Sequence, residues 1–155
     1  MDHYDLVVIG SGPAGEKGAA QAAYFGRRVA LVERAARPGG APVNSGGLPT
    51  KTLRETALYL TSYRRREVYG VGLALAPEIT LERMKARAET VSALAGDLVR
   101  ENLARHDITI HRGVARLGPG RSVIVAGEGG EEHELHAARI LIATGSRPYR
   151  PADVP

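Results

Sequence analysis

The stretch that decides the fold is YDLVVIGSGPAG, from Tyr4 to Gly15. Its first half, Tyr4 to Gly10, is a short and nearly continuous apolar run, which is typical of a strand buried on both faces of a parallel sheet. Its second half has the pattern G-x-G-x-x-G and leads into an Ala-rich helical segment that Gly26 would end as a C-cap. The stretch therefore predicts a strand, a tight glycine turn and a helix.

The glycine pattern predicts a dinucleotide site because a strand precedes it, a helix follows it and an acid ends the next strand. Gly10 permits the tight turn, Gly12 lets a pyrophosphate approach the backbone, and Gly15 lets the helix pack closely on the strand. The helix N-terminus offers unpaired N–H groups to phosphates. The site residues predicted here are Gly10, Ser11, Gly12, Pro13, Ala14 and Gly15.

The acid is Glu33, which ends the second predicted strand, RRVALVE. Its carboxylate can accept hydrogen bonds from an adenosine ribose, and it would repel a 2′-phosphate. The first site therefore favours FAD or NAD over NADP.

Two helices are expected in the middle of the chain, after a glycine-rich loop at residues 34–47. Pro49 opens the first helix at a position that proline tolerates, and this helix should run to about Arg66. Thr80 can cap the second helix. One apolar stripe on it packs either against the sheet or against a partner helix. The stripe consists of Leu81, Met84, Ala88, Val91, Ala95 and Leu98.

The last third of the chain predicts further strands. DITIHRG is a third strand, two short strands separated by turns follow, and Ile140 to Ala143 form another apolar strand. The order of elements predicts an α/β fold: a Rossmann-like, doubly wound parallel sheet with a small antiparallel β insert.

Composition excludes several classes of site. The 155 residues contain no cysteine, so this chain has no disulfide, thiolate zinc site or cysteine nucleophile. We expect a cytoplasmic location with no membrane contact, because no apolar run is long enough for a span and no secretory signal is visible. The net charge is +4, and its one dense basic run, Arg64 to Arg66, is either a solvated helix end or a phosphate patch. No nucleic-acid motif accompanies it.

The five histidines do not predict a metal site. His133 and His136 fall in a predicted strand, where a spacing of three puts side chains on opposite faces. His3, His106 and His111 have no partners at ligand spacing in the sequence.

Several motifs together resemble the flavoprotein reductases with two dinucleotide sites, the family that includes dihydrolipoamide dehydrogenase and glutathione reductase. They are VVIGSGPAG, LVE, GGAPVNSGGLPTK, GVARL and IATGSRP, and the resemblance covers essentially the whole chain. In this family the first motif binds FAD and a second one, later in a longer chain, binds NAD(P)H. The resemblance implies that Lys51 lies beside the isoalloxazine ring, where a positive charge would stabilise the reduced, anionic flavin. The further cofactor-binding residues that it implies are Arg34, Gly39, Gly40, Thr50, Val114, Ala115, Ala143, Thr144 and Gly145.

The loop GGAPVNSGGLPTK has no thiol where the disulfide reductases of this family have two. Pro42 and Gly47 stand at the matching positions, and thiol–disulfide exchange needs an attacking thiolate and a partner. The flavin would then be the last redox centre, as in the soluble (Si-specific) pyridine nucleotide transhydrogenases, which this chain resembles most. Alternatives are a diaphorase or NADH oxidase-like flavoenzyme, or a non-catalytic dinucleotide-binding module.

The resemblance also implies parts that are not in this chain. A nicotinamide-binding domain and a dimerisation domain should follow, so residues 1–155 would be the N-terminal part of an FAD-binding domain. The full-length protein would be a homodimer that uses NAD(P)H and NAD(P)+, and the 155 residues alone would be inactive.

Overall fold

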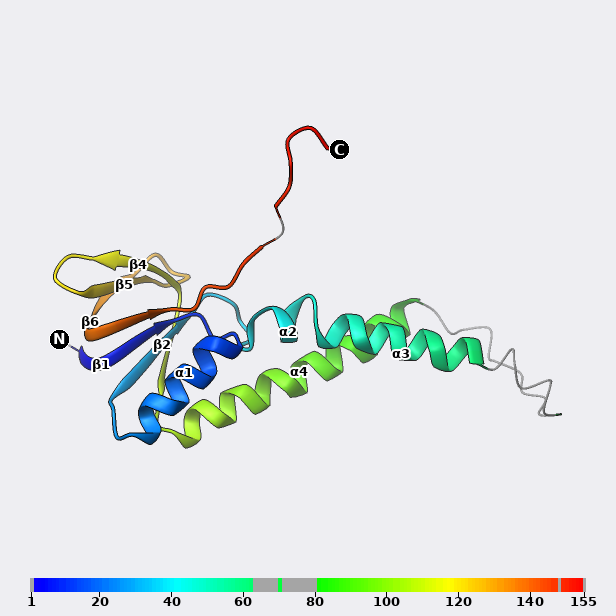
Figure 1. Ribbon diagram of the computed structural model, residues 1–155, viewed down its shortest axis with the longest axis horizontal. Helices are drawn as coiled ribbons and strands as arrows, with labels where there is room; N and C mark the ends of the chain where they lie inside the picture. Colours follow the sequence, from blue (N-terminus) through cyan, green and yellow to red (C-terminus); the bar gives the residue numbers. More distant parts are fainter. Residues whose placement is uncertain (1, 63–69, 71–80, 148, 155) are drawn as a thin grey trace. The chain divides into compact units, whose positions relative to one another are not determined.

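The computed structural model describes residues 2–62, 70, 81–147 and 149–154, and these form two compact units (Figure 1). The first unit contains Met1–Ala36 and Leu103–Pro155, and the second contains Arg37–Asn102. The first unit has the sheet and one helix, and the second is built from helices. The predicted helix end at Arg66, the cap Thr80 and the Arg64–Arg66 run lie outside the described residues.

The first unit is built on one six-stranded sheet in the order β3-β2-β1-β6-β5-β4. The strands are β1 (Asp2–Ile9), β2 (Val29–Glu33), β3 (Thr109–Arg112), β4 (Val114–Gly118), β5 (Ser122–Ala126) and β6 (Glu132–Ile142). The first three and β6 are parallel, whereas β4 and β5 pair antiparallel and β5 pairs antiparallel with β6. The predicted fold class is therefore confirmed.

Strand β1 lies between β2 and β6, and it is buried on both faces as its apolar run predicts. Val7 and Val8 are both inaccessible to solvent, although consecutive residues of a strand point to opposite faces. On one face lies α1 (Pro13–Tyr24), which contacts β1, β2 and β6. Ala19 of α1 is buried as well. Gly26, with a φ of +70°, follows the last turn and ends the helix, one position beyond its C-cap.

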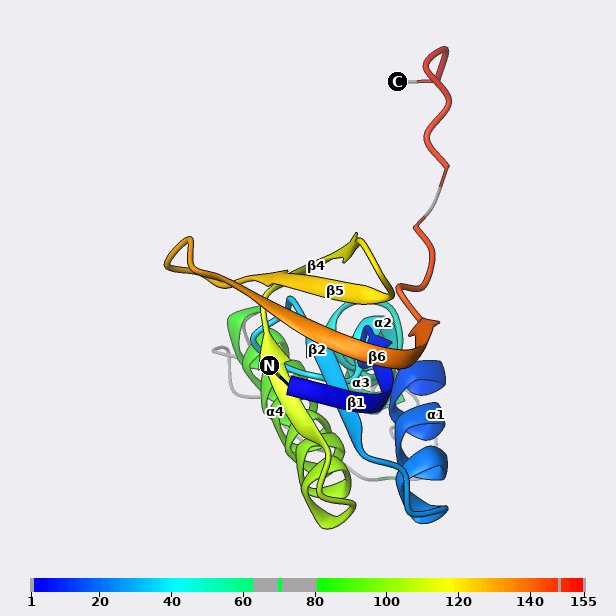
Figure 2. The ribbon, with the colours of Figure 1, turned by 90° about the vertical axis from the view of Figure 1, so that its left-hand side faces the viewer.

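The β4–β5 hairpin lies over the parallel strands β1 and β2 of the sheet (Figure 2). Its side chains form a single core cluster with those of the sheet, because Val123 and Val125 of β5 pack with Val7 of β1 and with Ala30 and Val32 of β2. Ala115 of β4 packs against this cluster.

Strand β6 corrects one detail of the expected strands. Ile140 to Ala143 do not form a separate strand, since Glu132–Ile142 is continuous and Ala143 follows it. The first residues of β6, Glu132 to His136, pair with β5, and those from Leu135 onward pair with β1. One strand therefore joins the antiparallel insert to the parallel sheet.

The second unit contains α2 (Gly40–Asn44), α3 (Leu48–Ser62) and most of α4 (Leu81–Arg105). The prediction of an uninterrupted loop at residues 34–47 is wrong, because α2 forms inside it. Gly39 begins α2 with a φ of +114°, a conformation that side chains disfavour, and the Asn44 amide donates hydrogen bonds to the carbonyls of Arg37 and Gly40. The sequence did not predict this short helix because glycine-rich segments are typical of loops.

The predicted stripe on α4 is correct in its middle and wrong at its ends. Ala88 is buried and Met84, Val91 and Ala95 are half-buried, but Leu81 and Leu98 are exposed. The buried face continues instead through three further residues. They are Ser92, Gly96 and Val99.

An ion pair joins the start of this unit to α4. The guanidinium of Arg37 donates a hydrogen bond to the carboxylate of Glu89, and the methylenes of Arg37 cover Gly96. The hydrogen bond from Arg37, followed by the charge attraction, lowers the pKa of Glu89 and raises that of Arg37.

We expect Glu89→Gln to lower the thermal midpoint of unfolding at pH 7 and to leave it unchanged in acid. Because the pKa of Glu89 is lowered in the folded state, the pair stabilises the fold above the unfolded pKa of about 4.3 and loses this effect as pH falls through the folded value. Thermal unfolding of both proteins between pH 3 and 7 measures the difference. Glu101→Gln, at an exposed acid on the same helix, is the control. A midpoint difference that does not change with pH would contradict the prediction.

Candidate functional site

The glycine turn between β1 and α1 is too crowded for side chains at two positions. Gly10 has a φ of +101°, and a Cβ atom on it would lie 2.5 Å from the carbonyl oxygen of Ala143. A Cβ atom on Gly15 would lie 1.8 Å from the carbonyl oxygen of Gly10. The amide of Ala143 in turn donates to the carbonyl of Ile9. Ala143, a predicted site residue, therefore lies directly against the turn.

The N-terminus of α1 has no side-chain cap. Gly12 is the N-cap residue in an extended conformation, Pro13 occupies the first turn, and the first helical amide bonded back to the turn is that of Glu16, which donates to the carbonyl of Gly12. The amides of Ala14 and Gly15 precede this bond and lie in the first turn, where a helix has no internal acceptors for its N–H groups. Such an end can bind the phosphates of an anionic ligand.

Glu33 lies at the same turn. One carboxylate oxygen accepts hydrogen bonds from the backbone amide of Ser11, at 2.9 Å, and from its hydroxyl, at 2.5 Å. The other oxygen accepts one from the amide of Ala35 at 2.7 Å. Three donors hold the carboxylate in place at the end of β2, beside the uncapped helix. An acid so fixed can accept further hydrogen bonds from the hydroxyls of a ribose.

Strand β4 starts next to Glu33. The amide of Gly113 donates to the carbonyl of Glu33 at 3.0 Å, so Val114 and Ala115 follow immediately at this corner. Strand β4 is at the edge of the sheet, and among the described residues no strand pairs with the other side of its backbone. Its N–H and C=O groups on that side can bind a base, and Val114 and Ala115 are cofactor-binding residues that the family resemblance implies.

The first unit thus brings together most of the predicted cofactor-binding residues. Arg34 follows Glu33 with an exposed side chain, and Thr144 and Gly145 follow Ala143 and are exposed. The remaining four belong to the second unit. They are Gly39, Gly40, Thr50 and Lys51.

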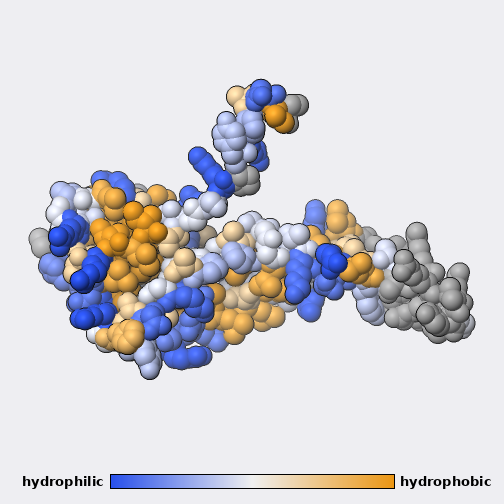
Figure 3. Space-filling model, in the orientation of Figure 1, coloured by the Kyte–Doolittle hydropathy of each residue, from blue (hydrophilic) through white to orange (hydrophobic). Residues whose placement is uncertain are grey.

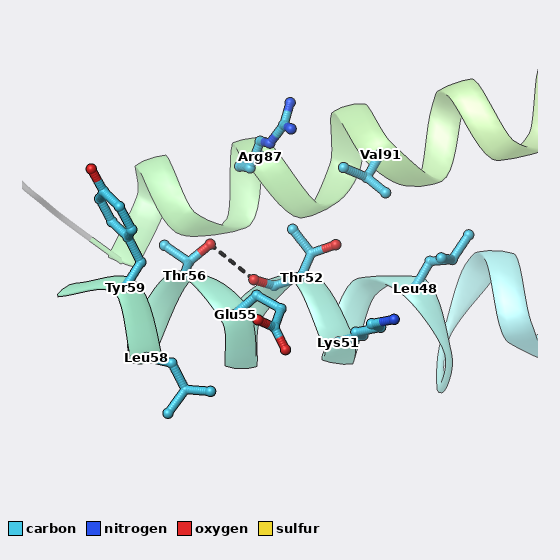
Figure 4. A pocket seen from close by; sticks show the side chains of 9 residues that line it. All are labelled: Leu48, Lys51, Thr52, Glu55, Thr56, Leu58, Tyr59, Arg87 and Val91. Carbon is cyan, nitrogen blue, oxygen red and sulfur yellow. Dashed lines mark hydrogen bonds between the residues drawn. The ribbon is translucent and has the colours of Figure 1, made fainter. Parts of the chain in front are cut away.

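Within the second unit, Thr50 and Lys51 lie in the first turn of α3, and the Lys51 amide donates to the carbonyl of Gly47 at 3.0 Å. An open groove of about 730 Å³ runs between α3 and α4, with the Lys51 side chain on its wall (Figure 4). The groove is lined by Leu48, Lys51, Thr52, Glu55, Thr56, Leu58, Tyr59, Arg87 and Val91. Of the α4 stripe, Val91 lines this groove opposite α3.

Pro42 and Gly47 lie in contact. A Cβ atom on Gly47 would be 2.5 Å from the carbonyl oxygen of Pro42 and 2.7 Å from its Cα atom. The two positions that matched the family's thiols are therefore neighbours in space, and neither has a sulfur atom. As it stands, this contact leaves no room for a side chain at Gly47.

Two side chains at or near the site, Glu16 and His111, were not found from the sequence, and for Ser11 the turn was predicted but not the contact of its hydroxyl with Glu33. Ser11 is fully buried. Glu16 is buried in the first turn of α1 and pairs with Lys17 at 2.8 Å. Its spacing to Ala19 and Ala20, three and four residues, was the signal that it faces inward. His111 has a partner after all, because it lies 3.0 Å from His133.

In the part of the chain that is described, none of the helices is both long enough and apolar enough to cross a bilayer.

A family model described as pyridine nucleotide-disulphide oxidoreductase matches residues 4–155. The chain is 41% identical over 155 residues to a soluble pyridine nucleotide transhydrogenase of Mycobacterium tuberculosis, covering 99% of this chain and 33% of that protein. It is also 36% identical over 146 residues to a dihydrolipoyl dehydrogenase of Zymomonas mobilis, covering 94% of this chain and 31% of that protein. The chain thus spans about a third of the length of these relatives.

A solved structure has the same fold. It is the Cu(II) complex of the HOCl-induced flavoprotein disulfide reductase RclA from Escherichia coli, with a TM-score of 0.76 and 29% sequence identity, covering 98% of this chain and 31% of that one.

Proposed function

Because the chain belongs to the pyridine nucleotide-disulphide oxidoreductase family, we propose that residues 1–155 are the FAD-binding part of a longer oxidoreductase that moves hydride between NAD(P)H and NAD(P)+. This assignment is supported by the length of the relatives, because this chain covers 33% of the transhydrogenase that it matches. The family and the flavoprotein neighbour indicate that the dinucleotide of the first site is FAD.

One observation supports the cofactor assignment above others: the Glu33 carboxylate is fixed beside an uncapped helix N-terminus. The helix amides would bind the diphosphate, Glu33 would accept hydrogen bonds from the adenosine ribose, and the edge of β4 would bind the adenine. A negative charge at this position disfavours a ribose 2′-phosphate, which favours FAD over an NADP-type ligand.

We also propose that this enzyme works without a redox disulfide. Support comes from the absence of cysteine in the 155 residues and from the contact between Pro42 and Gly47. When bound, FAD supplies a centre that accepts and returns hydride. Lys51 would provide positive charge beside the flavin ring, at the start of α3, and would stabilise the anionic reduced form.

The other parts of the proposal concern the whole protein. A nicotinamide-binding domain and a dimerisation domain would complete a cytoplasmic homodimer. The relatives named soluble transhydrogenases support the part of this proposal that concerns a soluble enzyme. The space-filling view shows apolar side chains at the surface of each unit (Figure 3). Exposed large apolar residues such as Leu94, Leu98 and Leu58 fit a surface that other parts of a longer protein cover.

The test uses the full-length protein with NADPH as the donor and thio-NAD+ as the acceptor. We expect bound FAD, direct transfer to thio-NAD+ with ping-pong kinetics, and no reduction of lipoamide or glutathione disulfide. Disulfide reduction at a rate comparable to transhydrogenation would contradict the mechanism without a disulfide. Faster transfer to a quinone or to oxygen would identify a diaphorase or an oxidase instead. A protein that binds no FAD would be a non-catalytic module.

A further inference from the structure

Four of the five histidines in the chain occur as two ring pairs in the first unit. The rings of His3 and His136 are stacked, with centroids 5.2 Å apart and planes inclined by 26°. The rings of His111 and His133 have centroids 5.1 Å apart and planes inclined by 42°. The two pairs differ in what their nitrogen atoms face.

The second pair directs two ring nitrogens at one another. Nδ1 of His111 lies 3.0 Å from Nε2 of His133, where the two rings share a hydrogen bond. Two imidazole nitrogens bound to one tetrahedral Zn²⁺ at about 2.0–2.1 Å lie roughly 3.3 Å apart. To become two ligands of one ion, the facing nitrogens must separate by about 0.3 Å more, the proton between them must move to the other nitrogen of its ring or to solvent, and both rings must turn so that their lone pairs converge.

A tyrosine holds the ring of His111 from its other side. The Tyr4 hydroxyl lies 3.4 Å from Nε2 of His111, and Tyr4 is buried beneath the guanidinium of Arg28. If Nε2–H donates to the Tyr4 oxygen, then Nδ1 keeps its lone pair for a ligand. A hydrogen bond at the second ring nitrogen is the usual support of a metal-binding histidine.

The charges around the pair permit a cation. Arg112, which follows His111, is paired with Glu128 at 2.5 Å, so its charge is neutralised nearby. His133 is exposed, which gives an ion access from solvent.

We propose that His111 Nδ1 and His133 Nε2 form a site for a divalent late transition metal such as Zn²⁺. Imidazole nitrogen suits Zn²⁺, Ni²⁺ and Cu²⁺, and Cu²⁺ should bind most tightly. Among the described residues no group of three His, Cys, Asp or Glu side chains comes together, so water completes the coordination and the ion exchanges readily. The ion would link β3 to β6, which are separated in the sheet by β2 and β1.

The stacked pair of His3 and His136 serves as an internal comparison. Imidazole lone pairs lie in the ring planes, so two nearly parallel stacked rings do not direct them at a common point. Of these two pairs, that of His111 and His133 has the edge contact that the site requires.

The test is isothermal titration calorimetry, in which Zn²⁺ is titrated into the intact protein and into its His133→Ala and His136→Ala variants. Zn²⁺ is the probe because, unlike Cu²⁺, it does not deprotonate backbone amides and so reports side-chain ligands. We expect His133→Ala to bind one equivalent of Zn²⁺ fewer than wild type and His136→Ala to bind the same amount. The difference between variants cancels any other zinc site in the full-length protein. Tyr4→Phe should keep the site with an affinity weaker by up to about tenfold.

Equal Zn²⁺ binding by wild type and His133→Ala would overturn the proposal, and so would the absence of saturable binding by wild type. His133 is exposed, so its replacement should not disturb folding. Circular dichroism of the variant checks this, and His133→Gln, which keeps a polar side chain, should lose the same equivalent.

Discussion

Gly15→Ala should yield a protein that is purified with little or no FAD and that unfolds at a temperature lower by roughly 5 °C. The added Cβ atom would lie 1.8 Å from the carbonyl oxygen of Gly10. Both atoms belong to the backbone or are attached to it directly, so no side-chain rotation relieves the clash. Helix α1 must move away from β1, and its N-terminal amides then lose their position relative to Glu33. The ratio of flavin absorbance to protein absorbance measures the retained cofactor.

Gly18→Ala is the matched control on the same helix. Its Cβ atom would lie 2.7 Å from a terminal methyl group of Leu141, which can rotate away. Alanine is also the better helix former by roughly 1 kcal/mol, so we expect near-normal stability and FAD content. If Gly15→Ala retained FAD as well as Gly18→Ala does, the close packing of this turn would not be needed for the cofactor.

Glu33→Ala should weaken FAD binding by about 10- to 100-fold, because hydrogen bonds to a charged group contribute about 1.5–3 kcal/mol. The substitution removes the acceptor proposed for the ribose hydroxyls. It also removes the acceptor that Ser11 and Ala35 share, so the turn loses the group that fixes its shape. Fluorescence titration of the apoprotein with FAD measures the dissociation constant.

Glu128→Ala removes the same charge from the same unit, at an exposed acid bound to Arg112. We expect its FAD affinity to equal that of the wild type. An equal loss in the two variants would mean that overall charge, and not the ribose contact, causes the effect. An unchanged affinity in Glu33→Ala would show that the ribose binds elsewhere.

The local part of the candidate site could be predicted from the sequence. The glycines from Gly10 to Gly15 form one turn between β1 and α1, which follow each other in the sequence. Their spacing in the sequence was therefore enough to predict the geometry of the turn. Glu33 ends the next strand, and parallel strands bring their carboxyl ends to the same edge of the sheet. The family motifs extended this reasoning to Val114, Ala115 and Ala143, which the structure places next to Glu33 or Gly10.

The non-local part could not be predicted. His111 and His133 meet because β4 and β5 fold over the sheet, and nothing in the spacing of 22 residues indicates this. The sequence predicted a separate strand at the end of β6 because Ile140 to Ile142 are continuously apolar, whereas the strand begins with three polar residues, Glu132 to Glu134. These two patterns reflect two environments of one strand, which pairs antiparallel with β5 and parallel with β1.

Helix α4 shows that the periodicity of apolar residues does not always identify the buried face of a long helix. Steps of three and four residues after Ala95 lead to Leu98 and to Val99, and the predicted stripe contains Leu98. The structure buries Val99 in part and exposes Leu98. Because both residues are apolar, the pattern could not decide between two faces that differ by one position.

The pairing of β1 with β6 has a consequence for biosynthesis. Ile9 pairs with Ile142, so β1 has only one of its two neighbouring strands until residue 142 has been made. At a translation rate of about 5–20 residues per second, the wait is on the order of ten seconds. During that interval one hydrogen-bonding edge of β1 is open to other nascent chains, and we expect chaperones that shield such edges to increase the yield of folded protein.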